Sequence, residues 1–124
     1  MKFINDKHKT QYEQILSGVQ KQKRDCYHKA FFFLMAAIGY NQQTITELYN
    51  FEEGCIMPEK FPCYASSGEL AIYRLAINLY TDRNGGDALG GYEKYTPVEL
   101  FSRVSNEWFL AMIEAINIRF ERVK

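Results

Sequence analysis

The sequence lacks an excess of charge of either sign, since fifteen Lys and Arg side chains balance fifteen Asp and Glu side chains. Without a positive surplus the chain has no overall field that attracts phosphate backbones, and without a negative surplus it does not imitate a nucleic acid. The longest apolar run, Ala30 to Tyr40, is about eleven residues, whereas a membrane-spanning helix needs roughly 20. We therefore expect neither direct nucleic-acid binding nor membrane insertion.

Cysteine and recognisable catalytic motifs are also scarce. The three cysteines, Cys26, Cys55 and Cys63, are odd in number and lack the paired spacing of a disulfide framework. The chain has no glycine-rich phosphate loop after a strand, no nucleophile elbow and no His-Glu-x-x-His sequence. It turns polar after Phe3 and Ile4, without the apolar core of a secretion signal. We therefore expect a cytoplasmic, non-enzymatic protein with reduced thiols.

The chain does have the composition of a folded domain, with 47% hydrophobic and 24% charged residues in a length of 124. Helical periodicity dominates, and no alternating strand pattern of useful length occurs. We predict an all-α single compact domain of about five to six helices. The expected helices cover residues 5–21, 25–38, 43–50 and 66–81, with a further helix starting at 96 and a last one over 105–121.

Two of these helices, over 25–38 and 66–81, are apolar nearly all round and should be central. A long irregular loop is expected over 51–66, and a mobile glycine-rich loop over 82–91. On the last helix one apolar stripe is expected to face the core. It comprises Phe109, Met112, Ile113, Ile116 and Phe120.

The first constellation of chemical interest is Asp25-Cys26-Tyr27-His28, at the start of the second expected helix. A thiolate is favoured at a helix N-terminus, and a Cys with a His suggests zinc. Cys26 and His28 lie ~200° apart on a helix. They can therefore share a metal ion only if Cys26 lies in the non-helical turn before the helix. Further ligands would be a loop cysteine, Cys55 or Cys63, or His8. The alternative is a capped helix with a packed thiol and imidazole.

The second constellation is Arg74 with Asn78 on an otherwise apolar helix. A guanidinium buried there needs an acidic partner. We expect Glu99, or else Glu47, to form a structural ion pair with Arg74. The alternative is a site for an anionic substrate.

The third constellation lies in the expected loop over 51–66, which contains both aromatic and acidic side chains. Such residues are typical of protein interfaces, so we expect this loop to bind a partner. The partner-binding residues predicted are Phe51, Glu52, Glu53, Met57, Phe61 and Tyr64. The alternative is that Phe51 and Phe61 cover the helical core.

The charge is unevenly distributed along the chain. Residues 1–30 carry seven basic and three acidic side chains, and residues 47–69 carry one basic and five acidic side chains. Segments of opposite sign dock on each other within a fold or present a two-signed surface to a protein partner. We expect docking within the fold, with a two-signed surface as the alternative.

Several blocks of the sequence resemble a family of small uncharacterised proteins of Firmicutes, their phages and their integrative elements. The resemblance extends over nearly the whole chain, in order and with similar spacing. The blocks are Asp25–Ala30, Leu48–Phe51 with Ile56–Glu59, Arg74–Tyr80, Tyr95–Phe101 and Glu114–Phe120.

This resemblance implies a protein of phages or mobile elements, and such proteins include counter-defence inhibitors of host nucleases. We therefore predict a non-enzymatic protein-binding module, an anti-CRISPR type of inhibitor with a structural zinc, whose partner is a host protein such as a CRISPR effector nuclease. Because the charge is balanced, it would bind without DNA mimicry. The alternatives are a small metal-dependent enzyme or metal-regulated module built on Cys26 and His28, and a structural protein.

Overall fold

Short polar side chains set the start of each α-helix in the computed structural model, which describes residues 1–62, 64–82 and 92–122. Their oxygen atoms accept backbone N–H groups of the first helical turn, which have no partner inside the helix. The capping residues are Asn5, Asp25, Ser66, Thr96 and Ser105. Each stands where the sequence predicted a helix to begin.

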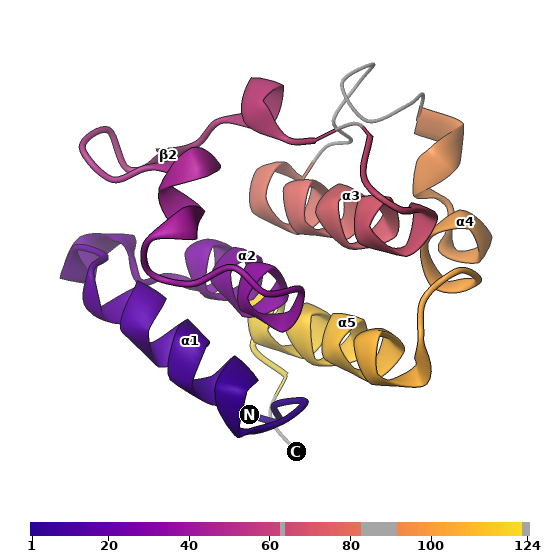
Figure 1. The fold of residues 1–124 in the computed structure, drawn as a ribbon, viewed down its shortest axis with the longest axis horizontal. Coiled ribbons are helices and arrows are strands. Elements are labelled where there is room, and N and C mark those ends of the chain that lie inside the picture. Colours follow the sequence, from indigo (N-terminus) through magenta and orange to yellow (C-terminus); the bar gives the residue numbers. More distant parts are fainter. Residues whose placement is uncertain (63, 83–91, 123–124) are drawn as a thin grey trace.

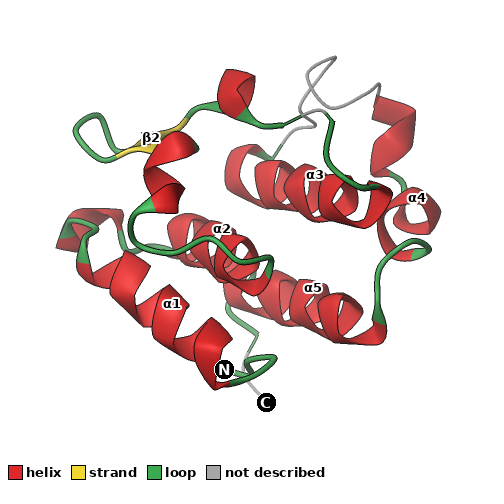
Figure 2. Ribbon diagram, in the orientation of Figure 1, coloured by secondary structure: helices red, strands yellow, loops and turns green. Residues whose placement is uncertain are grey.

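The described residues form five α-helices joined by short 3₁₀ turns and one very small hairpin (Figures 1 and 2). The α-helices are α1 (Asp6–Ser17), α2 (Cys26–Ala37), α3 (Ser67–Thr81), α4 (Pro97–Phe101) and α5 (Asn106–Arg119). The 3₁₀ turns are η1 (Lys21–Lys23), η2 (Thr44–Glu47), η3 (Pro58–Lys60) and η4 (Tyr92–Tyr95). The predicted mainly helical fold is confirmed. The mobile loop predicted over 82–91 lies outside the described residues except for Asp82.

The segment between α2 and α3 departs most from the prediction. The helix expected over 43–50 is the single turn η2, after which β1 (Tyr49–Asn50) pairs antiparallel with β2 (Cys55–Ile56). Gly54 permits this hairpin, because its φ is +70° and a Cβ there would come 2.8 Å from Lys23 Cε. The helix predicted over 43–50 was therefore wrong at Tyr49 and Asn50, and the irregular loop predicted over 51–66 contains the short strand β2 and the turn η3.

This acidic hairpin packs against the basic N-terminal part of the chain. Gly54 contacts the Lys23 side chain, and Phe51 lies beside Gly18 at the end of α1. The Gly54 carbonyl oxygen is 3.4 Å from Nε2 of His28 in α2. The hairpin thus packs on this part of the chain through Gly54 and Phe51, while the Glu52 and Glu53 side chains stay exposed, so the docking of opposite charges within the fold stays a prediction.

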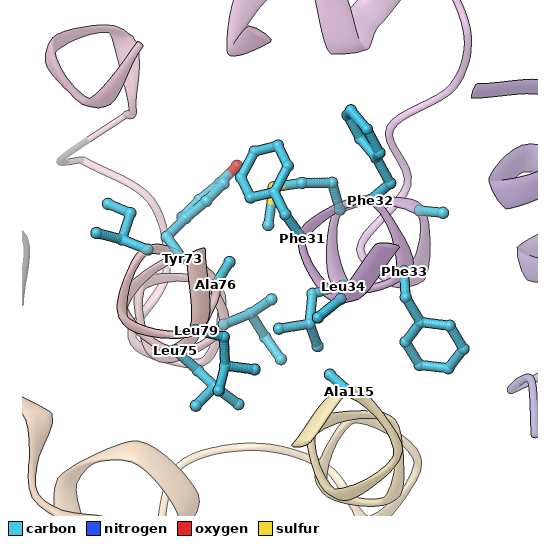
Figure 3. Packing of buried hydrophobic residues seen from close by; sticks show 14 of the residues in the cluster. Phe31, Phe32, Phe33, Leu34, Tyr73, Leu75, Ala76, Leu79 and Ala115 are labelled. Atoms are coloured by element: carbon cyan, nitrogen blue, oxygen red, sulfur yellow. The ribbon is translucent and has the colours of Figure 1, made fainter. Parts of the chain in front are cut away.

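Helix α2 is the centre of the molecule and packs against α1, α3 and α5. All residues from Ala30 to Ala36 are buried, as the apolar circumference of this helix predicted. Figure 3 shows Phe31 directed toward Tyr73 of α3 while Phe33 extends from another side of α2. Leu34 lies between α2 and its neighbours, close to Ala115 of α5. The chain therefore places its largest side chains around one helix.

The inward face of α5 differs from the predicted stripe. Its buried residues are Ala111, Met112 and Ala115, whereas Phe109 is 36% exposed and Phe120 is 54% exposed. The two alanines allow the backbone of α5 to approach α2 closely, which bulky residues at those positions would prevent. Of the predicted stripe, Met112 is buried and Ile116 packs against the core, so the prediction was right for these two and wrong for the exposed Phe109 and Phe120.

No helix in the parts of the chain that the structure describes is long and apolar enough to cross a bilayer.

Candidate functional site

The four residues Asp25, Cys26, Tyr27 and His28 at the start of α2 point in different directions. Asp25 precedes the helix and caps it, since its Oδ1 accepts the backbone N–H of His28 at 3.0 Å. Cys26 is the first helical residue and is half-buried. His28 is 6% exposed and faces the hairpin and α3. The turn therefore has a buried side and an open side.

On the buried side, Asp25, His28 and Tyr80 form a chain of hydrogen bonds. The Nδ1–H of His28 donates to Oδ1 of Asp25 at 2.8 Å, because a carboxylate can only accept. In the neutral imidazole Nε2 is then an acceptor, and the hydroxyl of Tyr80 lies 3.2 Å away as its donor. This Asp25–His28–Tyr80 chain connects the start of α2 to the end of α3.

The electrostatics of this chain follow from its burial. Desolvation raises the pKa of Asp25, but hydrogen bonds from the backbone and ring of His28 outweigh that effect and hold the pKa below its ordinary value. Burial, with the nearby Cys55, raises the pKa of Tyr80, so its hydroxyl stays protonated and can donate. The Asp25–His28–Tyr80 chain can thus orient an imidazole, and it joins α2, α3 and the hairpin.

On the open side, Cys26 lines a cavity of about 490 Å³. The cavity lies between the N-terminal residues, the start of α2 and the end of α5. Lys2, Arg24 and Lys29 line the same cavity, and Glu114 from α5 contributes a carboxylate. The Arg24 guanidinium is hydrogen-bonded outside the cavity, because its Nε–H donates to the Val19 carbonyl at 2.9 Å. The cavity is a water-accessible recess of mixed charge.

The predicted zinc ligands are not brought together as one set. His8 is buried, and both of its ring nitrogens have partners in the protein. Its Nδ1 accepts the Ile4 N–H at 3.0 Å, and its Nε2 donates to the Phe33 carbonyl at 2.9 Å. Cys55 is half-buried near Tyr80, on the side of His28, whereas Cys26 faces the cavity. Residue 63 is outside the described ranges, and within them no three His, Cys, Asp or Glu side chains cluster as metal ligands.

The zinc site therefore stays a prediction, and its geometry is unfavourable. Both ring nitrogens of His8 and of His28 have partners in the protein, so binding a metal would break one of these hydrogen bonds. A zinc site would show as about one zinc per chain after purification without a metal-affinity column, lost in Cys26→Ala and in His28→Ala. Metal retained by both variants would exclude these ligands.

The residues predicted to bind a partner divide into three groups. Phe61 is buried, with its ring 5.5 Å from that of Tyr73, so its assignment to a binding surface was wrong and it covers the core. Phe51 and Met57 are half-buried, and the Phe51 ring packs 4.8 Å from that of Tyr49. The remaining three are on the surface. They are Glu52, Glu53 and Tyr64, the last of which is 90% exposed.

The ion pair predicted between Arg74 and Glu99 also stays a prediction. The two residues are half-buried on α3 and α4, which pack against each other. Two other ion pairs join described residues, that of Asp25 with His28 and that of Asp82 with Arg119.

Arg119, at the end of α5, is the structural cation that the sequence analysis missed. Its Nε–H donates to the Leu79 carbonyl at 2.7 Å, a terminal nitrogen donates to Asp82 at 2.5 Å, and its guanidinium lies 3.7 Å over the Tyr27 ring. Burial lowers the pKa of Arg119, but the ion pair with Asp82 outweighs that effect and raises it. The available signal was its position four residues after Ala115, on the buried face of α5.

The chain belongs to a family of unknown function, DUF6075, whose model matches residues 1–124. No curated protein matches it, and neither does any solved structure. The expected resemblance to an uncharacterised family is thereby confirmed over the whole chain, and function has to be inferred from the side chains themselves.

Proposed function

We propose that this protein is a binding module that acts by forming a stoichiometric complex with another protein. The observation that carries the proposal is the exposure of Tyr64, which is 90%. A tyrosine so exposed adds nothing to the core, and tyrosine is among the residues most enriched as anchors in interfaces. Its ring is a large amphipathic contact surface that loses little conformational entropy on binding.

The acidic tip of the hairpin supports the same proposal, because its shape is fixed before any partner binds. Oδ1 of Asn50 accepts the backbone N–H groups of Glu52 at 2.9 Å and of Glu53 at 3.0 Å. The Gly54 N–H donates to the Asn50 carbonyl at 2.7 Å, which closes the turn. Two exposed carboxylates are therefore held on an ordered loop, where charge can select a partner and speed its association.

For the partner we propose a host nuclease effector of the CRISPR type, with the protein acting as a counter-defence inhibitor. This step rests on the resemblance to proteins of phages and mobile elements. The balanced charge favours contact with a protein surface over occupation of a DNA channel, since a DNA mimic carries a large negative surplus.

Titration of a purified effector nuclease tests this proposal. Cleavage should fall in proportion to the added protein and reach its minimum near one molecule per effector. Tyr64→Ala, and separately Glu52→Lys with Glu53→Lys, should weaken inhibition at least tenfold. Glu13→Lys, an equally exposed change on α1, is the matched control and should leave inhibition intact. Thermal unfolding of each variant shows whether the fold is preserved.

Two outcomes would contradict the proposal in different ways. Inhibition at far below one molecule per effector, or covalent change of the effector, would support the metal-dependent enzyme and overturn stoichiometric binding. Absence of complex formation across a panel of effectors would remove the counter-defence step.

A further inference from the structure

A groove of about 300 Å³ separates the N-terminal segment from the outer face of α5. Phe3 and Ile4 form one wall, and Leu110 with Ile113 forms the other. We call this feature the α5 groove. Ala111 of α5 also lines it, and of the stripe predicted to face inward only Ile113 belongs to it.

The dimensions of the α5 groove suit a helix. Its lining residues on α5 extend from Glu107 to Asn117. At 1.5 Å per residue they cover ~15 Å, the length of two to three helical turns. They recur at spacings of three and four and therefore form a continuous strip along α5.

The N-terminal wall of the α5 groove is fastened in place. The Ile4 N–H donates to Nδ1 of His8 at 3.0 Å, and the Lys2 N–H donates to Glu114 at 3.2 Å. The Phe3 ring packs 5.5 Å from the ring of Phe33 in the core. The groove is thus formed before a ligand binds, which lowers the entropy lost on binding.

The chemistry of the α5 groove is apolar with an acidic rim. Leu110 is 58% exposed and Ile113 is half-buried. Glu107 and Glu114 line the groove from α5 and are opposed by one cationic side chain, that of Lys2. An apolar strip beside carboxylates is complementary to a helix that carries bulky apolar side chains on one face and Lys or Arg beside them.

We propose that the α5 groove binds a basic amphipathic helix of the protein partner. The inference rests on the proposed function, and it adds a second contact surface and the chemistry that this surface recognises. Leu110, at the middle of the groove, would be the central apolar contact, with Glu107 and Glu114 pairing with cations at its edge.

The test uses two synthetic amphipathic peptides of about 18 residues, long enough to form a helix alone. One is built from leucine and lysine and the other has glutamate at every lysine position. Calorimetry should show binding of the lysine peptide at least tenfold tighter than that of the glutamate peptide. Backbone amide shifts on binding should concentrate at residues 2–4 and 107–117.

Matched variants locate the binding. Leu110→Asn should weaken binding of the lysine peptide at least tenfold, while Val98→Asn, at a 74% exposed site on α4 outside the groove, should leave it unchanged. Glu107→Lys, which leaves the hydrogen bond from Lys2 to Glu114 in place, should reduce the preference for the lysine peptide. Equal binding of both peptides, or an effect of Val98→Asn as large as that of Leu110→Asn, would overturn the inference.

Different results would contradict binding at the α5 groove and the proposed function. If Leu110→Asn inhibits the effector as well as the unaltered protein does, the groove is not a partner site, although stoichiometric binding through Tyr64 stands. If no effector is bound but the lysine peptide occupies the groove with the expected variant effects, the nuclease partner is wrong and the groove is supported.

Discussion

Helices α2 and α5 differ in sequence and in their situation in the fold, since α2 is apolar nearly all round whereas α5 carries Glu107, Glu114 and Arg119. Every residue of α2 from Ala30 to Ala36 is buried, whereas α5 buries only Ala111, Met112 and Ala115. Helix α2 has neighbours on several sides, and α5 is covered mainly by α2 and α3. Burial therefore follows the neighbours that surround a helix, and on the peripheral α5 apolar side chains such as Leu110 stay on the outer surface.

The two helices also differ in how their polar ends are held. At the start of α2, Asp25 and His28 are satisfied by each other and by Tyr80. At the end of α5, one residue, Arg119, makes all the polar contacts to α3 described above. The first arrangement is a distributed network, and the second depends on a single side chain.

The largest expected effect tests the burial difference directly. Leu34→Ala in α2 should lower the free energy of unfolding by about 2–5 kcal/mol, because it leaves a cavity in a closely packed core. Leu110→Ala on α5 should change it by less than about 0.5 kcal/mol, because that side chain is 58% exposed. Urea unfolding followed by circular dichroism measures both, and similar losses would show that the two helices do not differ as described.

A smaller effect is expected at the end of α5. Arg119→Met keeps the alkyl chain but removes the guanidinium that binds the Leu79 carbonyl and Asp82. The loss should be about 1–2 kcal/mol, toward the low end for a charged hydrogen bond because Asp82 is 63% exposed. Arg103→Met, at an exposed site before α5, is the control and should be close to neutral. A neutral Arg119→Met would show that α5 is held by apolar packing alone.

At the start of α2, Tyr80→Phe removes a single hydroxyl from the Asp25–His28–Tyr80 chain. We expect a loss of about 1 kcal/mol, since Nε2 of His28 then lacks its donor in a buried position. Tyr64→Phe, at a 90% exposed ring, is the matched control and should have no measurable effect on stability. The ¹⁵N chemical shift of His28 Nε2 should also move in Tyr80→Phe, and an unchanged shift would mean that no such hydrogen bond exists.

Local signals made much of the fold predictable. Each N-cap was visible as a Ser, Thr, Asn or Asp before an apolar periodic segment, and Asp25 with His28 three residues later lies within one turn. The burial of α2 followed from its apolar circumference. The hairpin was not predictable, because strands of two residues are shorter than any pattern that periodicity can detect.

The candidate sites were harder to predict because their partners are far apart in the chain. Tyr80 is 52 residues from His28, and Arg119 is 37 residues from Asp82. The inward face of α5 was ambiguous, since both the phenylalanine stripe and the alanine face have helical spacing. Close approach to α2 selected the small residues, and neither composition nor periodicity encodes that approach.

The smallest effect is confined to a window of pH and concerns His8, which joins α2 to a wall of the α5 groove. Burial lowers the pKa of His8 in the folded protein below 6.5, its ordinary value. As pH falls through about 6.5 the unfolded chain takes up a proton before the folded one does, so stability declines until the lower folded pKa is reached.

His8→Gln cannot titrate, yet its amide can still accept from Ile4 and donate to Phe33. The difference in melting temperature between the two proteins should therefore be constant above pH 7 and shift in favour of His8→Gln at lower pH. A difference that stays constant to pH 5 would show that His8 protonates in the folded state as readily as in the unfolded chain, and hence that burial does not lower its pKa.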